Sequence, residues 1–137
     1  MKTVTIDASA AASWLFRGQR TRTADAFLEG SVDRRFVAPG IFAWEIGNQI
    51  GIRARGDGRE VSRMLAHLGT LAIGIAPSPD VQAVFGSIDQ ALRRNLTLFD
   101  TAYPTHALEL GTSLASRDGR LLHAAEAAGV DVIDLRD

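Results

Sequence analysis

Short apolar segments alternate along the chain with longer segments of helical periodicity. Five segments rich in apolar residues predict strands, at Lys2–Ile6, Arg35–Ala38, Leu71–Ala76, Thr112–Ser116 and Val130–Leu135. The stretches between them predict helices at Ala8–Phe16, Thr21–Glu29, Ile41–Arg55, Thr101–Leu110 and Gly119–Ala128. Two more helices are indicated by i, i+3, i+4, i+7 spacing, through Val61, Met64, Leu65 and Leu68 and through Val81, Val84, Phe85 and Ile88.

Strands that alternate with helices predict a parallel sheet covered by helices on both faces. We therefore expect a single domain over residues 1–137, with a three-layer α/β/α sandwich of Rossmann-like type. Among the helix boundaries, Ser78 is the expected N-cap of the helix that follows, with Pro79 at its first position. Periodicity does not give the order of the strands.

Composition narrows the class of protein. Hydrophobic residues make up 46% of the chain, which is enough for a substantial core. Asp7 and Arg17 interrupt the N-terminal apolar region, so we expect neither a signal peptide nor a membrane span. The chain has no cysteine, which excludes disulfides and thiolate chemistry and fits a cytoplasmic protein. The net charge of −1 gives no overall attraction to nucleic acid, although the 15 basic residues include a single lysine and arginine suits phosphate.

Four acidic residues stand where a fold does not normally place charge. Asp7 and Asp118 each follow a predicted strand, Asp100 opens a predicted helix, and Glu45 lies early in another. Ligand sites of open α/β sheets lie at the carboxyl ends of the strands, so all four side chains are expected at one edge. Buried carboxylates need partners, and a set of oxygen ligands suits Mg²⁺ or Mn²⁺.

Each acid also has a structural explanation of its own. Asp100 and Asp118 precede helices, where aspartate is a favoured N-cap. Asp7 can close a turn. Glu45 shares a largely apolar helical stripe with Asn48, and a salt bridge to one of the arginines would satisfy it. These explanations account for the acids singly but not for their common edge.

The residues around the acids resemble the motifs of PIN-domain ribonucleases, in the family's order. The matching segments are Asp7-Ala8-Ser9, Glu45-x-x-Asn48, Asp100-Thr101-Ala102-Tyr103 and Ser116-Arg117-Asp118-Gly119-Arg120-Leu121. Size and minimal architecture are similar to the VapC toxins of bacterial toxin–antitoxin (VapBC) pairs, from Met1 to about Leu135. The chain departs from the pattern at Tyr103-Pro104-Thr105-His106, where the family usually continues with small and apolar residues.

The resemblance implies a Mg²⁺- or Mn²⁺-dependent endoribonuclease that hydrolyses RNA phosphodiester bonds. It implies Asp7, Glu45, Asp100 and Asp118 as the metal-binding and catalytic set, with Ser9, Asn48 and Ser116 as supporting polar residues. It also implies a cognate VapB-type antitoxin and a homodimer. Helices Ile41–Arg55 and Val61–Leu68 offer apolar stripes for such interfaces.

Contacts to RNA outside the acidic set are weaker predictions from the residues. Arg17, Arg20 and Arg22 are candidates for the rim of an RNA site, against the alternative of solvated surface charge. Trp14 and Trp44 can stack on bases, but core or interface packing is the better interpretation for both.

Two other functions remain open from sequence. A Rossmann-like phosphohydrolase would use Asp7 as a covalent nucleophile, but a second aspartate two residues later is replaced by Ser9, and no lysine follows Lys2. A PIN-like module that binds metal without cleaving RNA is the other alternative.

Overall fold

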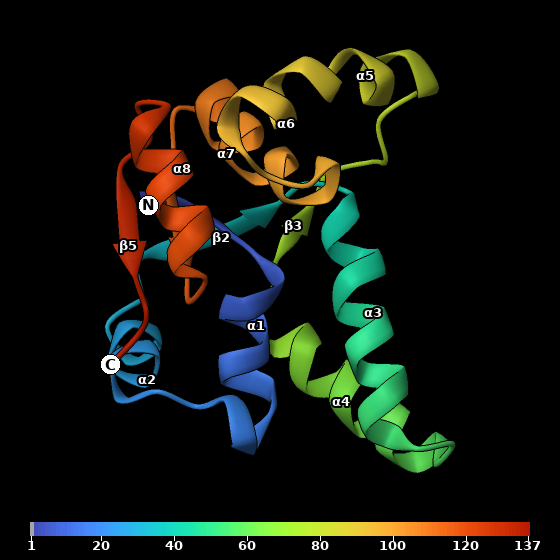
Figure 1. Ribbon diagram of the computed structural model, residues 1–137. Coiled ribbons are helices and arrows are strands. Elements are labelled where there is room, and N and C mark those ends of the chain that lie inside the picture. The colour runs from blue at the N-terminus through green and yellow to red at the C-terminus, as the bar shows by residue number, and fades with distance from the viewer. Residues whose placement is uncertain (1) are drawn as a thin grey trace.

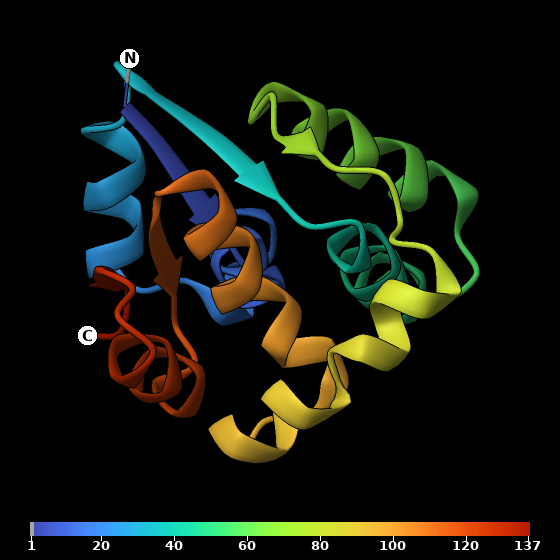
Figure 2. The same cartoon turned by 90° about the horizontal axis from the view of Figure 1, so that it is seen from above.

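The computed structural model describes residues 2–137 and contains a five-stranded parallel sheet. Its strands lie in the order β3-β2-β1-β4-β5. Their bounds are β1 (Lys2–Ile6), β2 (Arg34–Ala38), β3 (Gly74–Ile75), β4 (Ser113–Ser116) and β5 (Val132–Asp134). Figure 2 shows β1 and β2 running side by side in one direction. The predicted parallel sheet is confirmed, and β1 is its central strand.

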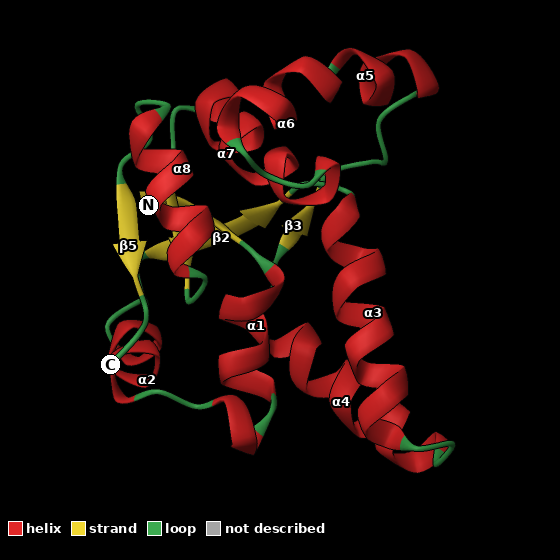
Figure 3. Cartoon of the chain, in the orientation of Figure 1, coloured by secondary structure: helices red, strands yellow, loops and turns green. Residues whose placement is uncertain are grey.

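Helices cover both faces of the sheet (Figure 1, Figure 3). Helices α1 (Ala8–Leu15), α2 (Arg22–Glu29), α3 (Ile41–Ala54) and α4 (Gly58–Thr70) gather on one side, with the 3₁₀ turn η1 (Arg17–Gln19) after α1. The opposite side carries α7 (Leu98–Leu110) and α8 (Gly119–Ala127), and α5 (Val81–Gly86) and α6 (Ile88–Arg94) lie beyond α7. This arrangement confirms the predicted three-layer α/β/α sandwich. None of the helices in residues 2–137 has the length and apolarity that crossing a bilayer requires.

Two predicted elements differ from the structure. The strand predicted at Leu71–Ala76 is reduced to Gly74–Ile75, because β3 pairs only with the last two residues of β2 before Pro39 interrupts the ladder. The helix predicted from Ser78 begins instead after Asp80, whose carboxylate accepts the Ala83 N–H at 2.8 Å. This helix is also divided in two at Ser87, which is both the C-cap of α5 and the N-cap of α6.

The two tryptophans occupy opposite environments. Trp14 is buried in the core, where its ring lies 5.2 Å from that of Phe36 and its indole N–H donates to the Ala24 carbonyl at 2.9 Å. Core packing is therefore confirmed for Trp14. Trp44 is 73% exposed on α3, so core packing is wrong for this residue. It lies next to Glu45 in a helix whose buried face is formed by Phe42, Ile46 and Ile50.

Gly40 fixes the start of α3, the helix that carries Glu45. A Cβ atom at this position would lie 2.8 Å from the Cα and 2.9 Å from the backbone N of Ser78. Real Cβ atoms do not approach backbone atoms so closely, and the loop at Ser78 is held between two prolines. Glycine therefore allows the two chain segments to touch, and the position of α3 depends on that contact.

Candidate active site

Two of the four predicted acids lie at the carboxyl ends of adjacent strands. Asp7 directly follows β1, and Asp118 lies two residues after β4. The strands pair in parallel, with Ile6 opposite Ala115. The chain therefore leaves both strands at the same edge, as the sequence predicts.

Asp7 is the most enclosed of these carboxylates, with 4% of its surface exposed. Its Oδ1 accepts the backbone N–H of Ala10 at 2.9 Å, which caps α1. The Ser9 hydroxyl donates to Oδ1 at 2.8 Å, and the Ser116 hydroxyl donates to Oδ2 at 2.7 Å. Burial outweighs these hydrogen bonds and, with a smaller contribution from the Asp118 charge, raises the pKa of Asp7 to about 6.

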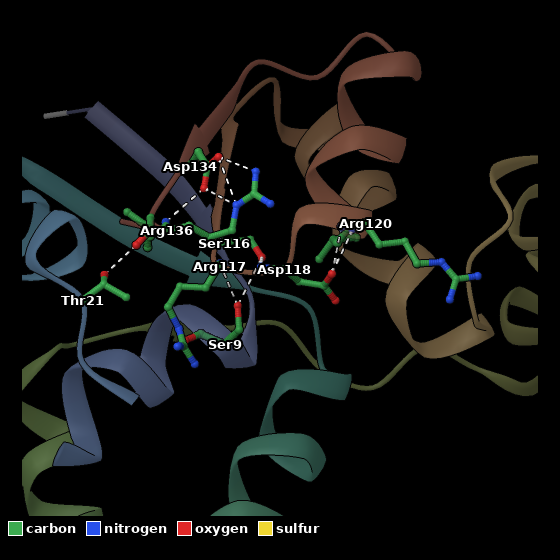
Figure 4. Close-up of polar contacts among 10 residues, drawn as sticks. Ser9, Thr21, Ser116, Arg117, Asp118, Arg120, Asp134 and Arg136 are labelled. Atoms are coloured by element: carbon green, nitrogen blue, oxygen red, sulfur yellow. Dashed lines mark hydrogen bonds and ion pairs between the residues drawn. The ribbon is translucent and has the colours of Figure 1, made fainter. Parts of the chain in front are cut away.

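The same two serines join Asp7 to the turn that carries Asp118 (Figure 4). Ser9 Oγ accepts the backbone N–H of Arg117, and Ser116 Oγ accepts that of Asp118, each at 2.9 Å. Asp118 in turn caps α8 by accepting the N–H groups of Arg120 at 3.0 Å and Leu121 at 3.3 Å. The structure thus brings the predicted supporting residues Ser9 and Ser116 into direct contact with this part of the acidic set.

Glu45 and Asp100 form the second part of the edge. The hydroxyl of Tyr103 on α7 donates to Glu45 Oε1 on α3. Burial raises the pKa of Glu45, the bond from Tyr103 opposes the rise, and the charge of Asp100 adds to it. Burial also raises the pKa of Asp100, with a contribution from the charge of Asp118. Like-charge repulsion therefore connects Asp7 to Asp118, Asp118 to Asp100, and Asp100 to Glu45.

The position of Asp100 differs from the sequence prediction. The N-cap of α7 is Thr97, whose hydroxyl oxygen accepts the Asp100 N–H at 3.0 Å, so Asp100 is in the first turn. Pro104 consequently lies inside α7 and not in its first turn, although the helix continues to Leu110 as expected. Proline has no N–H to give to the carbonyl four residues earlier, which belongs to Asp100.

Other predicted residues are not brought into contact with the carboxylates. Asn48 is exposed on α3, and the described residues include no hydrogen bond from it to any of the four acids. Arg17, Arg20 and Arg22 lie beyond the far end of α1, whose eight residues span about 12 Å from Asp7. Arg20 pairs there with Asp25 at 2.8 Å. Their proposed role in RNA binding stays a prediction.

Two residues at the site carry contacts that the sequence did not reveal. Tyr103 is 1% exposed and orients Glu45 from a helix 58 positions away in sequence. Arg117 donates from Nε to the Ser9 carbonyl at 3.2 Å and from Nη2 to Gln19 Oε1, which fastens the turn after β4 to α1. A tyrosine near the acid of a helix is a usable signal, because a buried phenol normally needs a polar partner.

The acidic set has no cation to balance it within residues 2–137. The three ion pairs of this part of the chain are Arg20–Asp25, Arg63–Glu60 and Arg136–Asp134, and none includes the four acids. In the described residues no three of these side chains are close enough to form a ready-made metal cluster. Oxygen donors with mutual repulsion nevertheless fit a hard divalent ion, which needs only one or two protein carboxylates and keeps several waters. The donor chemistry therefore fits Mg²⁺ or Mn²⁺.

Comparison with known proteins supports the fold. No protein-family model and no curated protein matches the chain. Among solved structures, PAE2754 from Pyrobaculum aerophilum has 20% identity and a TM-score of 0.63 over 98% of this chain and 90% of that one. FitAcB from Neisseria gonorrhoeae has 19% identity and a TM-score of 0.65 over 96% and 97%. FitAB bound to the IR36 DNA fragment has 19% identity and a TM-score of 0.68 over 96% and 94%. At these identities the similarity establishes a shared fold over nearly the whole chain.

Proposed function

We propose that this chain, whose fold is the PIN-domain fold of its structural neighbours, is a metal-dependent endoribonuclease. The observation that carries the proposal is the carboxylate set at the edge of β1 and β4. Its members raise one another's pKa values and have no ion-pair partner among the described residues. A fold stabilised for its own sake would pair or neutralise such charges, whereas a divalent ion needs them free.

The residues that would hold the ion are Asp7 and Asp100, with Glu45 and Asp118 completing or enlarging the site. Asp7 and Asp118 extend from the strand ends, and Glu45 and Asp100 from the helices beside them. When bound, Mg²⁺ or Mn²⁺ supplies an activated water and neutralises charge on the scissile phosphate. The structure does not decide between one ion and two.

The chain's own residues prepare these oxygens. Ser9 and Ser116 hold the Asp7 carboxylate from two sides, and Tyr103 holds Glu45. Each donor opposes the rise in pKa that burial causes, so it increases the fraction of carboxylate available at neutral pH. The helix N-termini of α1 and α8 act in the same sense at Asp7 and Asp118, because their free N–H groups point at negative charge.

The proposed role is that of the toxin in a toxin–antitoxin pair, from the motif resemblance. It includes a VapB-type antitoxin and a homodimer as partners. Three exposed apolar side chains support a protein contact at α3 and α4: Trp44 at 73%, Ile52 and Leu65. Light scattering of the isolated chain tests the dimer. A cytoplasmic location also stays a prediction.

A cleavage assay on a mixed RNA pool tests the proposed activity. The partner-free chain is assayed with Mg²⁺, with Mn²⁺ and with EDTA, beside Asp7→Asn and Asp100→Asn. Asp57→Asn is the matched control, because Asp57 is an exposed N-cap on α4 far in the sequence from the acidic set. Cleavage that needs metal and is lost only in the first two variants is expected.

The opposite results have a defined meaning. A folded chain that binds Mg²⁺ calorimetrically but cuts no RNA is a metal-binding module and not a nuclease. Equal cleavage by Asp7→Asn and Asp57→Asn would show that the carboxylate of Asp7 has no role in the reaction.

A further inference from the structure

A pocket of about 650 Å³ lies between α6 and α8, next to the turn that carries Asp118. Its polar lining consists of basic and neutral side chains from the two helices and their ends: Gln90, Arg93, Arg94, Asn95, Arg120 and His123. No carboxylate is among the residues that line it. Three guanidinium groups around one hollow repel one another unless an anion lies between them.

Arg94 shows this lack of a counter-ion most clearly. Its Nη1 donates to Thr101 Oγ1 at 3.1 Å and to Thr105 Oγ1 at 3.0 Å, both of which are neutral. None of the three ion pairs in residues 2–137 involves Arg93, Arg94 or Arg120. Partial burial and the charge of Arg93 both lower the pKa of Arg94. A bound anion would relieve both effects.

Arg120 connects this pocket to the carboxylate edge. Its backbone N–H donates to Asp118 Oδ1, and its guanidinium donates to the Asn95 carbonyl at the end of α6, each at 3.0 Å. Figure 4 shows the side chain of Arg120 extending away from Asp118. Its charge also lowers the pKa of Asp100. The pocket therefore begins where the acidic edge ends.

We propose that this arginine pocket binds a backbone phosphate of the RNA strand that lies across the carboxylates. The proposal rests on the proposed function and adds a substrate-positioning site to it. Arginine presents a planar fork that matches phosphate oxygens, and several such forks face one hollow here. The acidic edge repels a polyanion, so a strand needs a cationic contact beside it. The pocket supplies that contact one turn from Asp118.

Arg93→Gln tests the site with little risk to folding. Arg93 is exposed and makes no hydrogen bond within the described residues, unlike Arg94. Arg120→Gln is the second variant. Arg35→Gln is the matched control, because it removes the same charge from an exposed position at the amino end of β2, the opposite edge of the sheet. Thermal unfolding of each variant checks that the fold is retained.

The measurement is fluorescence anisotropy of a labelled single-stranded RNA in EDTA at several salt concentrations. We expect Arg93→Gln and Arg120→Gln each to weaken RNA binding by roughly tenfold, as for the loss of one charge-assisted hydrogen bond. The slope of log affinity against log salt should fall by about 0.7, the value for one phosphate contact on a single strand. Arg35→Gln should match the unsubstituted chain. Identical affinity and slope in all four proteins, or no RNA binding by any of them, would overturn the proposal.

Two further arms separate this site from other readings. Titration with inorganic phosphate is run on the same proteins. If Arg93→Gln loses only inorganic phosphate and keeps its RNA affinity, the pocket binds free phosphate and the strand assignment is wrong. If RNA binding depends on Arg93 but the chain cleaves no RNA with Mg²⁺ or Mn²⁺, the phosphate site stands and the nuclease function falls.

Discussion

Replacing Asp7 by asparagine should make the metal-free protein more stable at neutral pH. The ordinary pKa of an aspartate is 3.8, and burial raises that of Asp7 to about 6 in the folded chain. Below pH 3.8 the side chain is protonated in both states, and the stability associated with Asp7 is fully present. Between 3.8 and about 6 the unfolded chain releases a proton that the folded chain keeps, so stability falls as the pH rises. Above about 6 the loss is complete.

The size of this effect follows from the two pKa values. A tenfold change in proton affinity corresponds to about 1.4 kcal/mol, so a rise from 3.8 to about 6 corresponds to about 3 kcal/mol. Asparagine does not ionise. The difference in stability between Asp7→Asn and the unsubstituted chain should therefore shift by about 3 kcal/mol in favour of the variant across this window. Lost or altered hydrogen bonds to Ser9 and Ser116 add an offset that does not depend on pH.

Urea unfolding in EDTA from pH 4 to pH 8 measures this difference. Asp57→Asn is the control, because Asp57 is an exposed N-cap and asparagine caps equally well. Its stability should follow that of the unsubstituted chain at every pH. A constant difference between Asp7→Asn and the unsubstituted chain, or one that shifts in the opposite direction, would refute the reasoning. Repeating the series with Mg²⁺ should restore stability at pH 7 only in proteins that retain Asp7.

Three further substitutions test the contacts around the acids. Ser116→Ala should raise the pKa of Asp7 further and leave the Asp118 N–H without its acceptor, at a cost of about 1–3 kcal/mol in urea unfolding, unlike Ser87→Ala at an exposed hydroxyl. Tyr103→Phe should require more Mg²⁺ for half-maximal RNA cleavage, because the pKa of Glu45 rises without the hydroxyl; an unchanged Mg²⁺ requirement would contradict this. Gly40→Ala should lose about 1–3 kcal/mol, measured by urea unfolding, through contact with Ser78.

The sequence was sufficient for the fold class and for the edge on which the acids lie. Asp7 and Asp118 directly follow apolar strands, and a parallel sheet sends all such positions to one side. The order β3-β2-β1-β4-β5 was not predictable, because hydrophobic periodicity carries no information about which strands pair. The neighbouring positions of β1 and β4, which bring Ser116 to Asp7, became evident only in the structure.

The remaining differences have local or long-range causes. Thr97 followed three residues later by Asp100 is a recognisable start of a helix, so the error at Asp100 was one of cap choice. The bond between Tyr103 and Glu45 joins α7 to α3, and no local pattern reports such a contact. Trp44 is exposed because α3 is covered on one side only, which its mixed apolar stripe did not show.

The carboxylates of Asp7 and Asp118 serve α1 and α8 as caps in addition to any role in chemistry. Alanine scanning of this edge would therefore mix two losses, because alanine removes the charge and also leaves the first amides of the helix unpaired. Asparagine keeps an oxygen for the Ala10, Arg120 and Leu121 N–H groups. At these two positions only the isosteric amide separates an inactive protein from a partly unfolded one.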